Sequence, residues 1–174
     1  MLLFLPFRAP LGQHIPMNTL SRIILFTAFA FLSASGSFAQ AEKKPNPSYD
    51  AALAKKLGGN DGGMRQYVFV LLKTGPTPVP EGDERKAMFA GHMANMNRLA
   101  EEGKLVIAGP LDKVDGWRGL FIFAETDIEA VKKMVATDPV IIKGEMIAEY
   151  HKWYGSAGVM MLNDIHKKIS KTIE

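Results

Sequence analysis

The sequence predicts an α+β fold in which one antiparallel sheet of four strands carries two helices. Four short runs rich in apolar and β-branched residues favour strands, at residues 67–73, 105–111, 119–124 and 146–154. Apolar residues recur at helical spacing in the two segments between the outer pairs of runs, at 83–102 and 126–137. The expected order of elements is therefore β-α-β-β-α-β, with a further helix in the C-terminal tail.

Both helices of this unit have recognisable start and stop signals. In the first, Asp83 can cap the N-terminus and Gly103 ends the helix. The second opens with Thr126 and Glu129 as a capping box and ends near Thr137. The apolar positions of the first helix follow one face: Met88, Phe89, Met93, Met96, Leu99 and Ala100.

The order β-α-β-β-α-β is the ferredoxin-like arrangement, in which both helices cover the same face of the sheet. The other face would be polar if it met water. Residues 105–108 and 120–124 are instead apolar on both alternating sets, so the bare face needs a cover. A second copy of the same sheet is the simplest cover. We therefore expect a homodimer with the two sheets face to face.

The first 39 residues are typical of a secretory signal peptide. Arg22 precedes an apolar run at 23–32, and small residues follow at the spacing of a cleavage site between residues 37 and 41. The run has about ten residues whereas a membrane-spanning helix needs roughly 20, so a retained anchor is the weaker alternative. We expect an exported, periplasmic bacterial protein. Met17 opens a conventional signal peptide, so translation is expected to start there rather than at Met1.

Two segments extend the central domain, which is expected at residues 64–154. Residues 40–63 are expected to hold a short helix capped by Ser48, followed by flexible, glycine-rich spacing at 58–63. Residues 155–174 are expected to form an amphipathic helix that docks on its own or the partner subunit, with a membrane-surface helix as the alternative. The apolar positions of that helix are Leu162, Ile165, Ile169 and Ile173.

Composition argues against several classes of function. Of the 174 residues 47% are hydrophobic and 22% charged, as in globular rather than disordered chains. Without the leader, which contains Arg8 and Arg22, the chain carries 19 basic and 18 acidic residues, so nucleic acid is a poor partner. The absence of cysteine excludes disulfides and a cysteine nucleophile. Residues 58–63 lack the Lys-Ser/Thr ending of a phosphate loop, and no nucleophilic-serine elbow occurs.

His92 and Asp138 are the candidate catalytic residues. A histidine and a carboxylate are the side chains that proton-transfer chemistry uses near neutral pH. Each residue also has a purely structural interpretation. His92 lies one turn from both Met88 and Met96, as a core histidine would, and Asp138 with Pro139 is a common turn after a helix.

The last strand supplies three candidate substrate-binding residues. Ile147, Glu149, His151 and Trp153 share one face of that strand because its side chains alternate with a period of two. Glu149 and His151 are expected to border the cleft of His92, with the Trp153 indole as a lid; a half-exposed strand end is the alternative. Among these residues no metal-ligand spacing is recognisable, so we predict neither a metal site nor a bound cofactor.

Residues 64 to about 154 resemble the YCII-related family. The resemblance is carried by His92 in the first helix, by the strand segment 103–110 that ends in Gly-Pro, and by Asp138-Pro139 after the second helix. It implies a dimeric, ferredoxin-like α+β barrel related to muconolactone isomerase, with the histidine and the aspartate as the active-site dyad. Two positions depart from the family: Phe89 stands where members often carry arginine, with Arg85 one turn earlier, and Val140 stands where an aromatic residue often follows Asp-Pro.

The resulting functional hypothesis is a small exported enzyme that acts on a small organic substrate. In it, His92 oriented by Asp138 moves a proton in an isomerisation or an elimination. A ligand-binding or structural homodimer with a packed, chemically idle histidine is the alternative. A phosphohistidine role is implied by the family resemblance alone, and an exported location without ATP counts against it.

Overall fold

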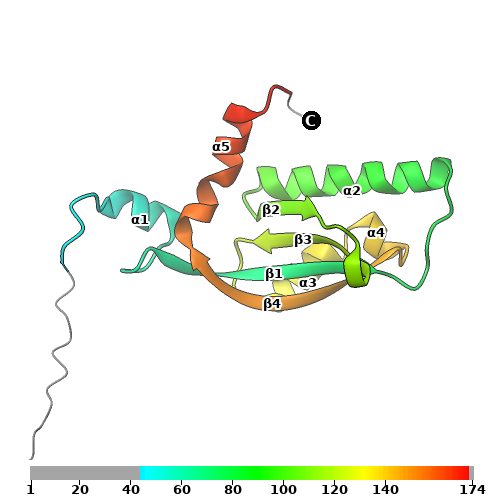
Figure 1. Cartoon of the computed structure of the whole chain (residues 1–174), viewed down its shortest axis with the longest axis horizontal. Coiled ribbons are helices and arrows are strands. Elements are labelled where there is room, and N and C mark those ends of the chain that lie inside the picture. The colour runs from blue at the N-terminus through cyan, green and yellow to red at the C-terminus, as the bar shows by residue number, and fades with distance from the viewer. Residues whose placement is uncertain (1–43, 173–174) are drawn as a thin grey trace, which may run out of the picture. The chain divides into compact units, whose positions relative to one another are not determined.

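A computed structural model describes residues 44–172 and has the α+β fold that the sequence predicts (Figure 1). Its central unit is a four-stranded antiparallel sheet with the order β-α-β-β-α-β, and one short additional helix precedes the last strand. The elements of this unit are β1 (Met64–Thr74), α2 (Asp83–Glu101), β2 (Leu105–Pro110), β3 (Trp117–Phe123), α3 (Ile128–Val135), α4 (Pro139–Ile142) and β4 (Met146–Ser156).

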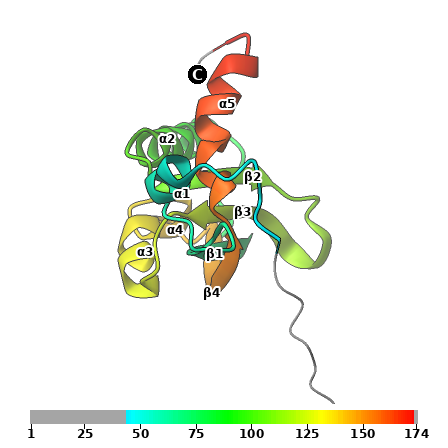
Figure 2. The same cartoon turned by 90° about the vertical axis from the view of Figure 1, so that its left-hand side faces the viewer.

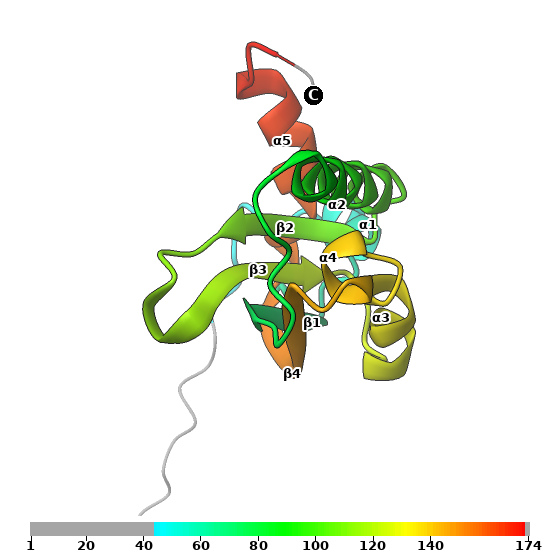
Figure 3. The ribbon, with the colours of Figure 1, turned by 90° about the vertical axis from the view of Figure 1, so that its right-hand side faces the viewer.

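The strands lie in the order β2-β3-β1-β4, and every neighbouring pair is antiparallel. Helices α2, α3 and α4 lie on one side of the sheet, as the two end-on views show (Figures 2 and 3). The main core is enclosed between these helices and the sheet. It contains, among others, Val68, Val70, Leu72, Met88, Leu99, Phe121, Phe123, Val131, Val135 and Val140.

The helix starts differ in detail from the sequence prediction. Gly82, not Asp83, is the N-cap of α2, and no side chain caps that end. Asp127 caps α3 by accepting a hydrogen bond from the backbone of Glu129, because Asp127 rather than Thr126 is the last residue before the helix. Helix α3 ends at Val135, two residues before the expected end near Thr137, and α4 is a separate helix with Asp138 as its N-cap.

The segment before β1 is more ordered than the sequence predicts. Helix α1 (Ala51–Leu57) is capped by Asp50 rather than Ser48. Residues 58–63 form a hydrogen-bonded turn instead of flexible spacing. The Asn60 side chain accepts hydrogen bonds from the backbone of Gly62 and Met64 and donates to the Tyr154 hydroxyl at 2.6 Å. The Asn60 side chain thus orders this turn, which the glycine-rich sequence alone did not predict.

The tail forms a short 3₁₀ helix, η2 (Ala157–Met161), followed by α5 (Leu162–Ile169). Val159 and Met160 of η2 pack on the sheet face opposite α2, against a small cluster that includes Tyr67. Helix α5 extends away from the sheet (Figure 1) and is tied to β2 by a 2.9 Å hydrogen bond from Asn163 to the Leu105 carbonyl. Its residues Leu162, Ile165 and Ile169 are exposed, and the predicted Ile173 lies outside the described residues.

The predicted signal peptide, its cleavage site and the two alternative start methionines also lie outside the described residues. Among the helices that the structure does describe, none is both long and apolar enough to cross a bilayer.

A β-bulge interrupts the pairing of β1 with β3 and changes the direction of one side chain. Leu72 pairs with Gly119 and Lys73 with Trp117, so Arg118 is an extra residue in β3. Bulges commonly re-aim a side chain. Here the Arg118 guanidinium reaches the buried carboxylate of Glu145 on the helix side of the sheet.

Candidate active site

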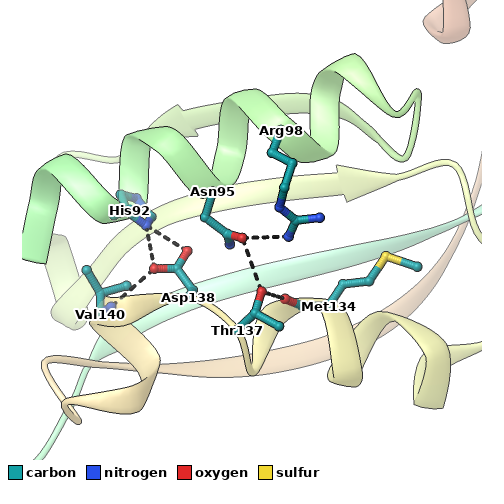
Figure 4. Close-up of polar contacts among 7 residues, drawn as sticks. All are labelled: His92, Asn95, Arg98, Met134, Thr137, Asp138 and Val140. Atoms are coloured by element: carbon teal, nitrogen blue, oxygen red, sulfur yellow. Dashed lines mark hydrogen bonds and ion pairs between the residues drawn. The ribbon is translucent and has the colours of Figure 1, made fainter.

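His92 and Asp138 meet in a buried pair between α2 and the start of α4 (Figure 4). Nδ1 of His92 lies 2.9 Å from Oδ1 and 2.8 Å from Oδ2 of Asp138. Asp138 is 1% exposed and His92 9% exposed. The same aspartate accepts a hydrogen bond from the backbone of Val140, so capping α4 also fixes the carboxylate. The two residues that the sequence singled out are therefore brought together.

The carboxylate determines which nitrogen of His92 carries the proton in the neutral ring. Because Nδ1 faces an acceptor, its proton is held there and Nε2 keeps its lone pair. Nε2 makes no hydrogen bond with any described residue, and no buried side-chain nitrogen or oxygen in that part of the chain lacks a partner. Nε2 therefore reaches open space. The rings of Phe89 and Phe121, at centroid distances of 6.2 and 6.1 Å, flank the imidazole.

Close approach of α2 to the corner before α4 depends on Gly91. A Cβ atom at this position would lie 2.9 Å from Cγ of Pro139, closer than side chains pack. The residue before the histidine and the residue after the aspartate thus touch, and this contact sets the separation of the dyad. A second tie lies one turn further on, where the Thr137 hydroxyl is 3.1 Å from Oδ1 of Asn95 (Figure 4).

Gly91→Ala is expected to loosen the dyad and to destabilise the domain by about 1–3 kcal/mol, the usual cost of overpacking a tight contact. The rigid Pro139 ring cannot turn away, so α4 must move from α2 and lengthen the His92–Asp138 hydrogen bonds. Chemical denaturation and a crystal structure of the variant test this. Ala90→Gly, at the preceding helix position, is the matched control for helix propensity. An unchanged stability and an unchanged dyad would show that the contact is not restrictive.

A cavity of about 1160 Å³ extends from His92 along α2 and β2 to α5, and Asp138 does not line it. His92 lines it, and two arginines, Arg85 and Arg118, line the same cavity. Most of its other walls are apolar and include Phe89, Met93, Met96, Ile107, Phe121, Leu162 and Ile165. The site therefore combines a histidine with an open nitrogen, two guanidinium groups and an apolar surface large enough for a small organic molecule.

The model of one protein family, the YCII-related domain, matches residues 67–153, which is half of the chain. The chain belongs to the YCII-related family. The match spans β1 to β4 and includes both members of the dyad. The chain matches none of the curated proteins with which it was compared.

The YCII-related domain contains a second buried polar cluster, centred on Glu145, which sequence reasoning missed. This carboxylate is 2% exposed and accepts a 2.7 Å hydrogen bond from the backbone of Val79. Nη1 of Arg85 lies 3.0 Å from Oε1 of Glu145, and Nη1 of Arg118 lies 3.3 Å from the same oxygen. Burial by itself raises the pKa of Glu145, but the Val79 N–H and the two guanidinium groups outweigh it and hold the pKa below its ordinary value.

The cluster also explains a departure of this chain from the family pattern. The resemblance of the sequence implies arginine at the position of Phe89, where this chain has an aromatic ring. The Arg85 guanidinium lies over that ring, with Cζ 4.9 Å from its centroid. A cation is therefore present at this end of the cavity, supplied from one turn earlier on α2 and stacked on Phe89.

Glu149, His151 and Trp153 do not share the cleft of His92, so that prediction is wrong. Within β4, Ala148 and Tyr150 face the helices and pack against the main core. Glu149, His151 and Trp153 alternate with them and face the other side of the sheet, because strand side chains alternate. There Trp153 contacts the Tyr67 ring at 5.2 Å, and Glu149 pairs with Lys73 at 2.9 Å. The sequence correctly grouped these residues but assigned them to the wrong face.

The described part of the YCII-related domain brings together no group of three or more His, Asp or Glu side chains that could hold a metal ion. His92 and Asp138 face each other, whereas Glu149 and His151 lie across the sheet from them.

Proposed function

We propose that this protein is an acid/base enzyme in which His92, oriented by Asp138, transfers a proton within a small organic substrate. The observation that carries this proposal is the open Nε2 of His92. Its partner nitrogen is held by a carboxylate that is fixed in turn as a helix cap. Asp138 stabilises the imidazolium that forms when Nε2 accepts a proton, as a buried carboxylate does behind catalytic histidines elsewhere.

The proposed reaction class is one that a single base, Nε2 of His92, can carry out. Nε2 removes a proton from a carbon next to an electron-withdrawing group. The imidazolium then returns that proton to another atom, which is an isomerisation, or protonates a departing group, which is an elimination. Phe89, Phe121 and Met96 form apolar walls of the cavity that His92 lines. General acid/base catalysis of this kind contributes typically 10²–10⁴-fold.

Solvent exchange tests this proposal before the substrate is known. A panel of small cyclic and unsaturated carbonyl compounds is incubated with the protein in D₂O, and deuterium at carbon is followed by proton NMR. We expect exchange with the native protein and none above background with His92→Asn. Ligand binding without exchange for every compound that binds would favour the alternative, a non-catalytic ligand-binding or structural dimer in which the histidine is packed.

We also propose that the functional unit is a homodimer formed through the sheet face opposite α2. Phe69, Ile107 and Leu120 are only partly buried there, and Ile147 and Trp153 are exposed. Helix η2 covers the end of this face near Tyr67, so the uncovered apolar area is smaller than the sequence suggests. A second copy of the sheet would bury what is left.

The dimer makes a direct prediction for Leu120→Lys, in the middle of this face. A buried ammonium on each of two facing sheets is expected to convert the protein to a monomer in analytical ultracentrifugation at micromolar concentration. Val114→Lys, in the exposed turn between β2 and β3, is the control and should leave the dimer intact. A native protein that sediments as a monomer at that concentration would rule out the homodimer.

We further propose that residues 1–39 direct export to the bacterial periplasm. The support is the charged, apolar and small-residue order of the leader. N-terminal sequencing of the exported protein is expected to begin near residue 40, and of the unprocessed precursor at Met17. A full-length protein that stays in the cytoplasm would contradict export.

A further inference from the structure

We propose that the arginine end of the cavity binds the carboxylate of the substrate, and that the substrate is an organic acid with an apolar body. The inference rests on the proposed acid/base function for the role of His92, but the binding site itself does not. It is carried by the juxtaposition of Arg85 and Arg118 at one end of a largely apolar cavity.

Hydrogen-bond donors remain available on both guanidinium groups. Arg118 uses only Nη1 within the described part of the chain, and Arg85 uses Nη1 and Nε. No buried side-chain nitrogen there lacks a partner, so the remaining Nη2 groups are accessible to solvent, and both arginines line the cavity. The Nε contact of Arg85 is with Glu81, whose side chain is 93% exposed and easily displaced. Guanidinium groups with unused donors are the preferred protein ligands of carboxylates.

The charges at this end call for a single anion. Arg85, Arg118 and Lys113 line this cavity, and the carboxylates of Glu145 and Glu81 pair with the arginines, which leaves a surplus of one positive charge among these five groups. Glu101, another carboxylate that lines the cavity, lies sixteen residues further along α2 and thus roughly 24 Å away. A monoanionic carboxylate compensates this surplus, whereas a phosphate dianion would exceed it.

The cavity-facing side of α2 arranges the groups in one row. Arg85, Phe89, His92 and Met96 follow each other at helical spacing and all line the cavity. Arg85 and His92 are seven residues apart, about two turns and roughly 11 Å of helix rise. A carboxylate held at Arg85 and Arg118 therefore places an apolar skeleton across Phe89, with a carbon several bonds from the carboxylate at Nε2.

The β-bulge turns the Arg118 side chain toward the helix side of the sheet, which supports a role in ligand binding in addition to its ion pair with Glu145. Strict alternation along β3 would place Arg118 on the same face as Leu120, away from His92, and the bulge returns it to the helix side. Gly119, which follows, has no side chain to occupy that space, and a Cβ atom there would meet the Gly109 carbonyl at 3.0 Å. The local backbone is thus shaped to present a second guanidinium to the cavity.

A comparison of acids with their neutral amides tests the carboxylate site in the unaltered protein. The probes are trans-cinnamate with cinnamamide and octanoate with octanamide, with binding followed by saturation-transfer NMR. We expect each acid to bind at least about tenfold more tightly than its amide, the effect of one charge-assisted hydrogen-bonded pair. Equal affinities, no binding of either acid up to about 10 mM, or a tenfold preference for phenyl phosphate would overturn the assignment.

Variants locate the site and separate this inference from the proposed function. Arg118→Met leaves Glu145 paired with Arg85 and is expected to weaken binding of cinnamate about tenfold without changing that of cinnamamide. Arg98→Gln removes a cation from the exposed end of α2 and should change neither. His92→Asn should retain the preference for acids. If the native protein prefers acids but turns over none of the compounds that it binds, the carboxylate site stands and the acid/base function is refuted. If the protein turns over a neutral substrate and Arg118→Met does not change that turnover, the acid/base function stands and the carboxylate site is refuted.

Discussion

His92→Asn is expected to lower turnover of the native substrate by 10²–10⁴-fold while the domain stays folded. The amide nitrogen of asparagine can take the position of Nδ1 and donate to Asp138, so the buried carboxylate keeps a partner. Nε2, the atom that faces the cavity, is lost. The variant therefore separates the chemistry of the ring from its packing, which His92→Ala does not. Steady-state kinetics on a substrate identified by solvent exchange measure the effect.

His151→Ala is the matched control for this variant. His151 is exposed on the opposite face of the sheet, 6.0 Å from the Phe69 ring, and has no contact with the dyad. At a concentration where both variants have the native oligomeric state, the turnover of His151→Ala should remain near that of the native protein. If His92→Asn retained activity and only lowered the melting temperature, His92 would be a packing residue and not the catalytic base.

Glu145→Gln is expected to destabilise the domain by about 3 kcal/mol, because removing one member of a buried ion pair leaves its partners uncompensated. The glutamine oxygen can still accept the hydrogen bond from Val79, but Arg85 and Arg118 lose their shared anion. For a domain of this size the melting temperature should fall by roughly 10 °C. Glu84→Gln, which breaks the exposed pair with Lys143, is the control and should lower the melting temperature far less.

The same carboxylate predicts an acid dependence of stability. The pKa of Glu145 lies below its ordinary value of 4.5 in the folded protein, so the folded state favours its charged form. Its contribution is present above pH 4.5 and is lost as the pH falls through the lower folded-state pKa. Native protein should therefore lose stability below about pH 4.5. Glu145→Gln should lose less over that range, and a parallel decline in both proteins would show that other carboxylates dominate.

The fold could be predicted from the sequence because its signals are local. Apolar runs with helical spacing between them gave the order of elements, and Gly103 ended the first helix close to where it was expected. The dyad could also be predicted, since His92 lies on the apolar face of one recognisable helix and Asp138 follows the end of another. Their 2.8 Å contact depends on how α2 packs on α4, which spacing along the chain does not describe.

The remainder of the site could not be predicted because it depends on strand register. A bulge of one residue decides that Arg118 faces the cavity, and alternation alone would assign it to the other face. Glu145 stands next to Gly144 at the start of β4, where a charged side chain is usually exposed, and only the tertiary fold buries it. The prediction that Glu149 and His151 share one face of the strand was correct. Periodicity alone does not say whether that face points to the helices or to the other side of the sheet.

The tautomer of His92 is the most direct test of the proposed dyad, and it requires no substrate. Long-range ¹H–¹⁵N correlation spectra of the labelled protein distinguish protonated Nδ1 from protonated Nε2 in the neutral ring. We expect the proton on Nδ1, held by Asp138, with Nε2 free to accept, and we expect Asp138→Asn to abolish this preference. A neutral His92 with its proton on Nε2 would mean that the atom facing the cavity is not a base.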